Sequence, residues 1–235
     1  MMQHPAPERP SDIDPLAEAL LTQLQSYPAA RHIVLGGYFA LKHYFDYRVT
    51  HDVDAWWAEE SRESDREQAR AALKAVLESL ANEKGLTVKR RRFGDTESWE
   101  LLRAGTKIFS FQIASRTLRL EPSVPSPWPP LLIETFVDNV ASKMNALVQR
   151  GAPRDFADIR QLVTAGHLTP AECWDLWRRK NPDLNPVDAR AEVGRHLHEI
   201  ELRRPLDTLT DPAQREQAWQ TRTWFRSVFL QPSQP

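Results

Sequence analysis

The sequence predicts an α+β protein in which a small mixed β-sheet domain is followed by a helical domain. Three observations indicate this. Up to residue 120, short apolar runs typical of strands alternate with segments of helical spacing. After residue 130, every periodic segment has helical spacing. Between them lies EPSVPSPWPP, in which five of ten residues are proline, so we expect no regular structure there and place the domain boundary in it.

The elements of the first domain follow from apolar spacing and from turn residues. Leu16, Leu20 and Leu24 have helical spacing, and the apolar run before Gly36 indicates a short buried strand. Gly-Asp and Ala-Gly-Thr turns suit antiparallel hairpins. We expect a disordered lead-in over 1–14 and, within 15–120, a helix over 16–24, a strand over 32–35, a helix ending at 41, a strand over 52–57, a helix over 64–82 closed by Gly85, and strands over 86–93, 97–103 and 107–114.

The second domain, over residues 130–235, is expected to be helical. Thr169 followed by Pro170 is a helix start signal. Four tryptophans at helical spacing, Trp174, Trp177, Trp219 and Trp224, are predicted to fill the helical core, with an interface to a partner as the alternative. The expected helices cover 131–149, 154–164, 169–180, 186–203 and 211–229.

Composition excludes several classes of protein. With 235 residues and 41% hydrophobic content the chain can bury a core, and its net charge of −1 gives no global basic field of the kind that marks nucleic-acid binders. Cys173 is the single cysteine, so an internal disulfide or a cysteine metal cluster is excluded. The sequence contains no apolar run of membrane-spanning length and no signal-peptide pattern, so we expect a cytoplasmic protein that does not bind a membrane.

Two carboxylates suggest a metal site. Asp52 and Asp54 are one residue apart on a predicted strand, so both side chains point to the same face. Mg²⁺ is bound in proteins by one or two carboxylates together with waters and substrate phosphates. The spacing alone also fits a solvated turn, so the metal assignment depends on the surrounding sequence.

That surrounding sequence contains a glycine turn. Gly36 and Gly37 stand between the predicted strand at 32–35 and a helix, where glycine allows the backbone to approach a phosphate. The alternative is a tight strand-to-helix turn without a ligand. This order of a strand, two glycines, a helix and a strand that begins with two aspartates resembles the core unit of polymerase-β-like nucleotidyltransferases, and the resemblance favours the metal site.

The second half contains KMNALVQRGAPRDFADIRQL, with charged residues on two successive predicted helices. Lys143 has no acid on its own helical face and is therefore a candidate phosphate ligand. Asp155 and Asp158 share one face of the next helix and could hold Lys143 or Arg154. The same residues could instead form an ordinary salt-bridge network between helices.

At this point the sequence resembles the AbiEii-type nucleotidyltransferase toxins of bacterial abortive-infection and toxin–antitoxin systems, through GGYFALKH, RVTHDVDAWW and KMNALVQRGAPRDFADIRQL. The resemblance implies an Mg²⁺-dependent enzyme that transfers a nucleotidyl group from a nucleoside triphosphate to an acceptor, such as a tRNA acceptor end or a protein, and that has a cognate antitoxin. It implies a helical domain that contributes to the active-site cleft. The implied catalytic residues are Asp52, Asp54, Lys143 and Asp155, with Asp52 and Asp54 as metal ligands; the implied nucleotide-binding residues are Gly36, Gly37, Thr50, Lys143, Arg150, Arg154 and Asp158.

One position departs from this pattern. Polymerase-β-like enzymes usually have a third carboxylate on a neighbouring strand, where this sequence has Gln112. By alternation Gln112 should face Asp52 and Asp54, but an amide is a poor proton acceptor. Glu100, on the preceding predicted strand, is a candidate substitute.

A basic run, Lys89 to Arg92, either contacts an RNA backbone or forms a solvated strand edge. Two other functions remain open. Gln112 and the helical tryptophans fit a non-catalytic nucleotide-binding or protein-interaction module. The paired aspartates also fit a metal-dependent phosphohydrolase.

Overall fold

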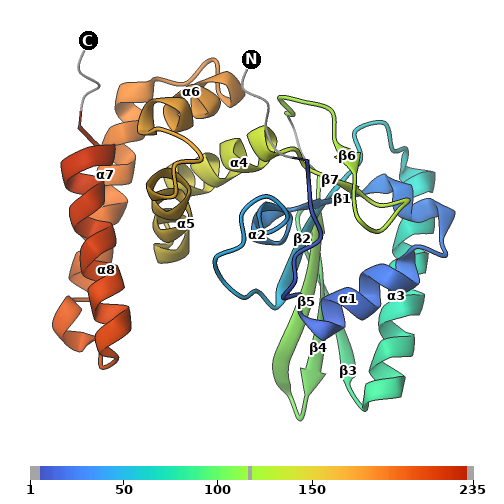
Figure 1. Ribbon diagram of the computed structural model, residues 1–235. Coiled ribbons are helices and arrows are strands. Elements are labelled where there is room, and N and C mark those ends of the chain that lie inside the picture. The colour runs from blue at the N-terminus through green and yellow to red at the C-terminus, as the bar shows by residue number, and fades with distance from the viewer. Residues whose placement is uncertain (1–5, 116–117, 232–235) are drawn as a thin grey trace. The chain divides into compact units, whose positions relative to one another are not determined.

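The computed structural model of the protein describes residues 6–115 and 118–231 (Figure 1). Over these residues it has eight α-helices and one seven-stranded mixed sheet, which confirms the predicted α+β class. The chain divides into two compact units, Met1–Asn139 and Val140–Pro235. Each unit is described by itself. None of the helices in the described part is both long and apolar enough to cross a membrane.

The sheet lies entirely in the first unit. Its strand order is β3-β4-β5-β2-β1-β7-β6. The pairs β2–β5 and β1–β7 are parallel and the other neighbours are antiparallel. The strands are β1 (Ile33–Gly36), β2 (Asp52–Trp57), β3 (Thr87–Phe93), β4 (Thr96–Arg103), β5 (Thr106–Ala114), β6 (Val124–Pro125) and β7 (Leu132–Ile133).

Helices α1 (Pro15–Leu24) and α3 (Glu63–Lys84) lie side by side and form the main core with the sheet (Figure 1). The buried side chains of β2 and β5 that face this core are Val53, Ala55 and Trp57, and Phe109, Phe111 and Ile113. Alternation along these strands therefore turns the intervening residues, Asp52 and Asp54 among them, to the opposite face. A 3-10 turn, η1 (Pro28–His32), precedes β1, and the short helix α2 (Gly37–Leu41) follows it.

Local signals in the sequence mark the helix ends. Asp14 caps α1 by accepting hydrogen bonds from Leu16 N–H (2.8 Å) and Ala17 N–H (3.3 Å). Gly85 ends α3 in the left-handed region, with φ 63°, as predicted. The disorder predicted for 1–14 falls partly on residues 1–5, which lie outside the described residues. From residue 6 to residue 14 the chain has no helix or strand, but Glu8 N–H donates to His43 O over 2.8 Å.

The proline-rich segment differs from its prediction. We expected no regular structure in it, but Val124 and Pro125 form β6, which pairs with β7. Proline is tolerated because β6 is an edge strand, where no neighbour requires its missing N–H. The helix expected from 131 begins at Phe136 as α4 (Phe136–Gln149), because Leu132 and Ile133 pair with β1 as β7.

The second unit contains the rest of α4 and four further helices: α5 (Pro153–Thr164), α6 (Pro170–Lys180), α7 (Pro186–Arg203) and α8 (Pro212–Trp224), with η2 (Leu206–Thr208) before α8 and a π-helical turn, η3 (Phe225–Phe229), after it. Trp174 and Trp177 are buried as predicted and pack against each other, and Trp174 also packs against Phe229. Trp219 is 52% exposed, so its assignment to the core was wrong. It lies on the solvent side of α8, where helical spacing alone does not separate core from surface.

Candidate functional site

Asp52 and Asp54 lie on the face of β2 that points away from the α1–α3 core. Their neighbours in the strand, Val53 and Ala55, are 0% and 2% exposed, whereas both aspartates are partly exposed. A strand with one buried face and one open face therefore presents two carboxylates on the same side, as the sequence predicted.

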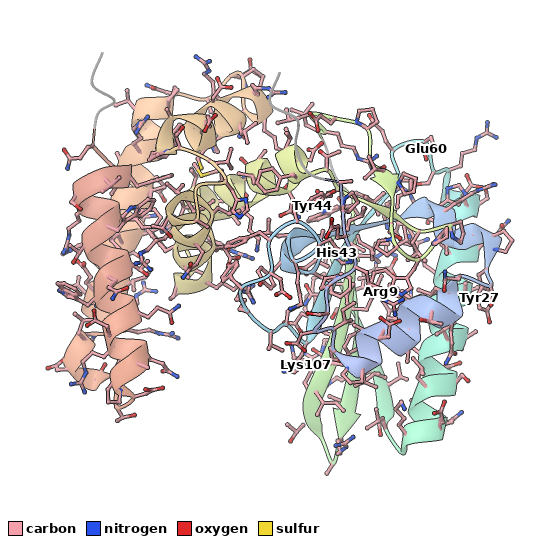
Figure 2. The ribbon with its side chains drawn as sticks, in the orientation of Figure 1. Arg9, Tyr27, His43, Tyr44, Glu60 and Lys107 are labelled. Atoms are coloured by element: carbon pink, nitrogen blue, oxygen red, sulfur yellow. The ribbon has the colours of Figure 1, made fainter. Side chains whose placement is uncertain are left out.

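Asp52 is held by polar groups from β5 and from its own strand. Ser110, fully buried, donates from Oγ to Asp52 Oδ1 over 2.6 Å. Lys107 Nζ lies 3.3 Å from the same oxygen; Lys107 is labelled in Figure 2, near the end of the sheet where β5 begins. The Thr50 hydroxyl accepts from Asp52 N–H (3.3 Å) and donates to Asp52 O (3.2 Å). Thr50 thus fixes the backbone at the start of β2, while Ser110 and Lys107 orient the carboxylate.

The glycine turn packs directly against Asp54. Gly36 pairs with Asp54 in the antiparallel ladder between β1 and β2. Gly37 has φ +60°, and a Cβ atom there would lie 2.2 Å from Asp54 Oδ2. A Cβ on Gly36 would lie 2.2 Å from Nε1 of Trp56. Both positions therefore require glycine, and at Gly37 the backbone conformation requires it as well.

A buried polar group supports this turn from the start of α4. Asn139, 0% exposed, donates from Nδ2 to Gly37 O over 2.8 Å and to Glu134 Oε2 over 3.0 Å. Tyr44, labelled in Figure 2, donates to the Glu134 carbonyl over 2.6 Å. Sequence reasoning missed Asn139, because its contact with Gly37 spans 102 positions and no local motif marks it.

Gln112 lies beside Asp54, as alternation predicted. The parallel pairing of β2 with β5 sets Asp54 opposite Gln112 and Asp52 opposite Ser110. Glu100 stands opposite Ser110 on the far side of β5 and is 3.3 Å from Arg91. Glu100 is thus one strand further from the aspartates than Gln112 is. The chemical role of either residue stays a prediction.

The two aspartates suit Mg²⁺ with substrate more than a metal held by protein alone. No group of three or more His, Cys, Asp or Glu side chains able to hold a metal occurs in the described part of the chain. Mg²⁺ needs only one or two carboxylates when waters and phosphates complete its six positions. The Asp54 carboxylate occupies the position that a side chain at Gly37 would take, so glycine lets this carboxylate lie directly against the turn. These residues therefore fit the ion that the resemblance implies.

In the second unit, the charged residues of α4 and α5 form two separate ion pairs. Lys143 Nζ is 2.6 Å from Asp158 Oδ2, and both side chains are buried. Arg150 donates to both oxygens of Asp155, each over 2.9 Å, and Asp155 also accepts from Ala152 N–H over 3.1 Å. Asp155 and Asp158 are both 0% exposed, and each of these buried carboxylates lies against a cation.

These pairs bear on the alternatives left open by the sequence. Lys143 pairs with Asp158 of the next helix, one of the two partners that the sequence offered. Asp155 binds Arg150, not Lys143 or Arg154. Arg154 is exposed and forms no ion pair with any residue that the structure describes. A nucleotide-binding role for these residues stays a prediction.

Comparison with known proteins supplies the family. No curated protein matches the sequence. The family described as "Nucleotidyl transferase AbiEii toxin, Type IV TA system" matches residues 19–224, a span that includes the glycine turn, both aspartates of β2 and the ion pairs of α4 and α5. The chain belongs to this family of nucleotidyl transferase toxins.

Proposed function

We propose that this protein is an Mg²⁺-dependent nucleotidyltransferase and the toxin of a bacterial toxin–antitoxin or abortive-infection system. It would act in the cytoplasm and transfer a nucleotidyl group from a nucleoside triphosphate to an RNA, with a tRNA acceptor end as the first candidate and a protein as the second. The observation that carries the proposal is the packing of Gly37 against Asp54, in a chain of the AbiEii family.

In this proposal Asp52 and Asp54 hold Mg²⁺, which would neutralise charge on the triphosphate as pyrophosphate leaves. Ser110 and Lys107 keep the Asp52 carboxylate oriented. The Gly36–Gly37 turn leaves the backbone accessible to phosphate. By family likeness, Lys143 and Arg150, paired with Asp158 and Asp155, would bind the nucleotide.

Charge on the open sheet face supports an RNA acceptor. The pairing registers align Asp54 with Gln112, Ser98 and Arg91 across four strands, and Asp52 with Ser110, Glu100 and Lys89. Cross-strand partners share a face, so Lys89 and Arg91 lie on the same face as the aspartates. Three strand spacings separate them, about 14 Å. Exposed cations at this distance suit the phosphate backbone of an acceptor whose end reaches the metal.

One observation favours a second candidate, a nucleotide-binding protein without transferase activity. Gln112 stands where a third carboxylate would be expected, and an amide cannot accept the acceptor proton efficiently. This candidate predicts nucleotide binding without turnover.

The test is to incubate the full-length protein with each α-labelled nucleoside triphosphate and total RNA or total protein, with Mg²⁺ or with EDTA. Labelling of RNA that occurs with Mg²⁺ but not with EDTA supports the proposal. Labelling of protein instead would identify a protein as the acceptor. Free labelled nucleoside phosphate as the only product would indicate a phosphohydrolase. Calorimetric binding of triphosphate without any product would favour the non-catalytic candidate.

A further inference from the structure

The second unit contains a pocket of about 290 Å³ formed by α5, α7, α8 and the η2 segment. Its lining includes three arginines from three different elements: Arg154 at the start of α5, Arg204 just after α7, and Arg222 in α8. No aspartate or glutamate is among the lining residues. The pocket therefore concentrates positive charge without any lining acid.

These arginines differ from most of their neighbours. Within the described residues, none of the three forms an ion pair with a carboxylate. Five other arginines of the unit pair with an acid: Arg150 with Asp155, Arg178 with Asp175, Arg195 with Glu192, Arg203 with Glu199, and Arg226 with Glu201. The pocket is therefore a place where three arginines without an acidic partner among the described residues lie on one lining.

Arg222 is the most informative of the three, because it is only 8% exposed. Its side chain makes one hydrogen bond to the described residues, from Nη2 to the Arg204 carbonyl, over 2.7 Å. Arginine is rarely buried without an acid, since removing a guanidinium from water is costly unless an anion compensates its charge. A buried guanidinium that lines a pocket and has no carboxylate partner indicates that the compensating anion is a ligand.

The rest of the lining defines the kind of anion. Phe156, Leu197 and Ile200 supply apolar surface, and the amides of Gln214 and Gln217 can pair with polar edges of a ring. Guanidinium forks match phosphate oxygens. A volume of about 290 Å³ is at the lower end for ligand pockets, which suits a small molecule. We propose that this pocket binds a small phosphate ester with a flat, partly apolar body, of the class of nucleoside monophosphates.

The test is calorimetry of the full-length protein with AMP, ribose 5-phosphate and adenosine, all in EDTA, with Asp52→Asn/Asp54→Asn as a background that removes the proposed metal ligands. We expect one AMP per chain in both proteins, weaker binding of ribose 5-phosphate, and none of adenosine. Arg154→Ala should weaken AMP binding about tenfold or more, as loss of a charged hydrogen bond predicts. Arg222→Lys should do the same while keeping the charge, because lysine lacks the fork.

Arg203→Ala is the matched control. Arg203 precedes Arg204 in the chain, is highly exposed and pairs with Glu199, so its removal changes the net charge equally but leaves the pocket intact. Arg154 is also exposed, so Arg154→Ala remains informative if Arg222→Lys fails to fold. The proposal is overturned if AMP does not bind, if adenosine binds as well as AMP, if Arg203→Ala weakens binding as much as Arg154→Ala, or if Asp52→Asn/Asp54→Asn abolishes binding. None of these results depends on transferase activity, so the proposed function can fail or stand separately.

Discussion

Gln112 and Asp54 are direct neighbours in the parallel ladder between β2 and β5. The adjacent rung pairs Asp52 with Ser110, whose hydroxyl is 2.6 Å from the Asp52 carboxylate. On these two rungs the open face thus carries two carboxylates, one hydroxyl and one amide. Since the amide carries no charge, a third carboxylate there would change both the charge and the proton affinity of the site.

We therefore expect Gln112→Glu to raise basal transfer, because a carboxylate can take the acceptor proton where an amide cannot. Single-turnover transfer at saturating Mg²⁺ measures this. Glu100→Gln is the companion variant. A flat or lower rate in Gln112→Glu, together with loss of activity in Glu100→Gln, would mean that Glu100 already acts as the base and that the new charge repels the triphosphate.

Asp52→Asn and Asp54→Asn should each lower the Mg²⁺-dependent rate about a thousandfold, equivalent to about 4 kcal/mol of transition-state stabilisation. Their melting temperatures should change little, because both side chains are partly exposed. Asp95→Asn, at the exposed turn after β3, is the control for a lost surface carboxylate. Near-normal activity in either β2 variant would contradict the proposed metal site.

Gly37→Ala should weaken divalent-metal binding, because the new methyl group would lie 2.2 Å from Asp54 Oδ2 and displace that carboxylate. Mn²⁺ affinity followed by electron paramagnetic resonance measures the effect without substrate. Gly94→Ala is a matched control: its φ is +56°, so the backbone strain is similar, but no atom lies within 4 Å of the added carbon. Equal Mn²⁺ affinity in the Gly37 and Gly94 variants would show that the close approach of Gly37 to the Asp54 carboxylate is not needed for metal binding.

Lys143→Met should lower the free energy of unfolding by about 3–5 kcal/mol, because it removes the Lys143 ammonium from a buried ion pair with the Asp158 carboxylate. Denaturant unfolding measures this. Adding Asp158→Asn should recover part of the loss by removing the stranded charge. Calorimetry with triphosphate on this double variant then tests nucleotide binding apart from stability. Unchanged affinity would restrict Lys143 to a structural role.

Acid should destabilise the fold through His43. Burial lowers the pKa of this side chain from 6.5 to about 4; Nδ1–H donates to Phe39 O over 2.8 Å, and the ring packs against Trp128. Between these two pKa values the unfolded chain binds a proton that the folded chain does not. Stability is therefore full above pH 6.5 and falls as the pH drops toward 4, by up to about 3 kcal/mol. Denaturant unfolding at several pH values should show a shallower slope in His43→Leu than in the exposed control His198→Gln.

Sequence patterns predicted the elements that carry strong local signals. The alternation of Val53 and Ala55 with the two aspartates set the polar face of β2, and it also placed Gln112 beside Asp54. Gly85 ended α3 as expected. For the polar face of β2 and the end of α3, neighbouring residues determine the geometry; the position of Gln112 beside Asp54 also requires the pairing of β2 with β5.

The features that were missed depend on contacts distant in sequence or on very short elements. The two-residue strands β6 and β7 are too short to show periodicity, and they form because β1 offers a free edge. The contact of Asn139 with Gly37 depends on the packing of segments 102 residues apart, whereas Arg150 and Asp155 pair across the short turn between α4 and α5. Helical spacing placed Trp174 correctly and Trp219 wrongly, because it identifies a face without saying what covers it.

The position of β7 limits where recombination between relatives can join two such sequences without damaging the sheet. The break in composition at EPSVPSPWPP lies inside the sheet, since β6 and β7 complete it on the β1 side. A recombination event there would separate β1 from its parallel neighbour and expose the backbone N–H and C=O groups of a fully buried strand. It would also remove Asn139 from the glycine turn. We therefore expect the segment that relatives exchange as a whole to extend beyond the start of α4. Chimaeric proteins joined within the proline-rich segment should aggregate.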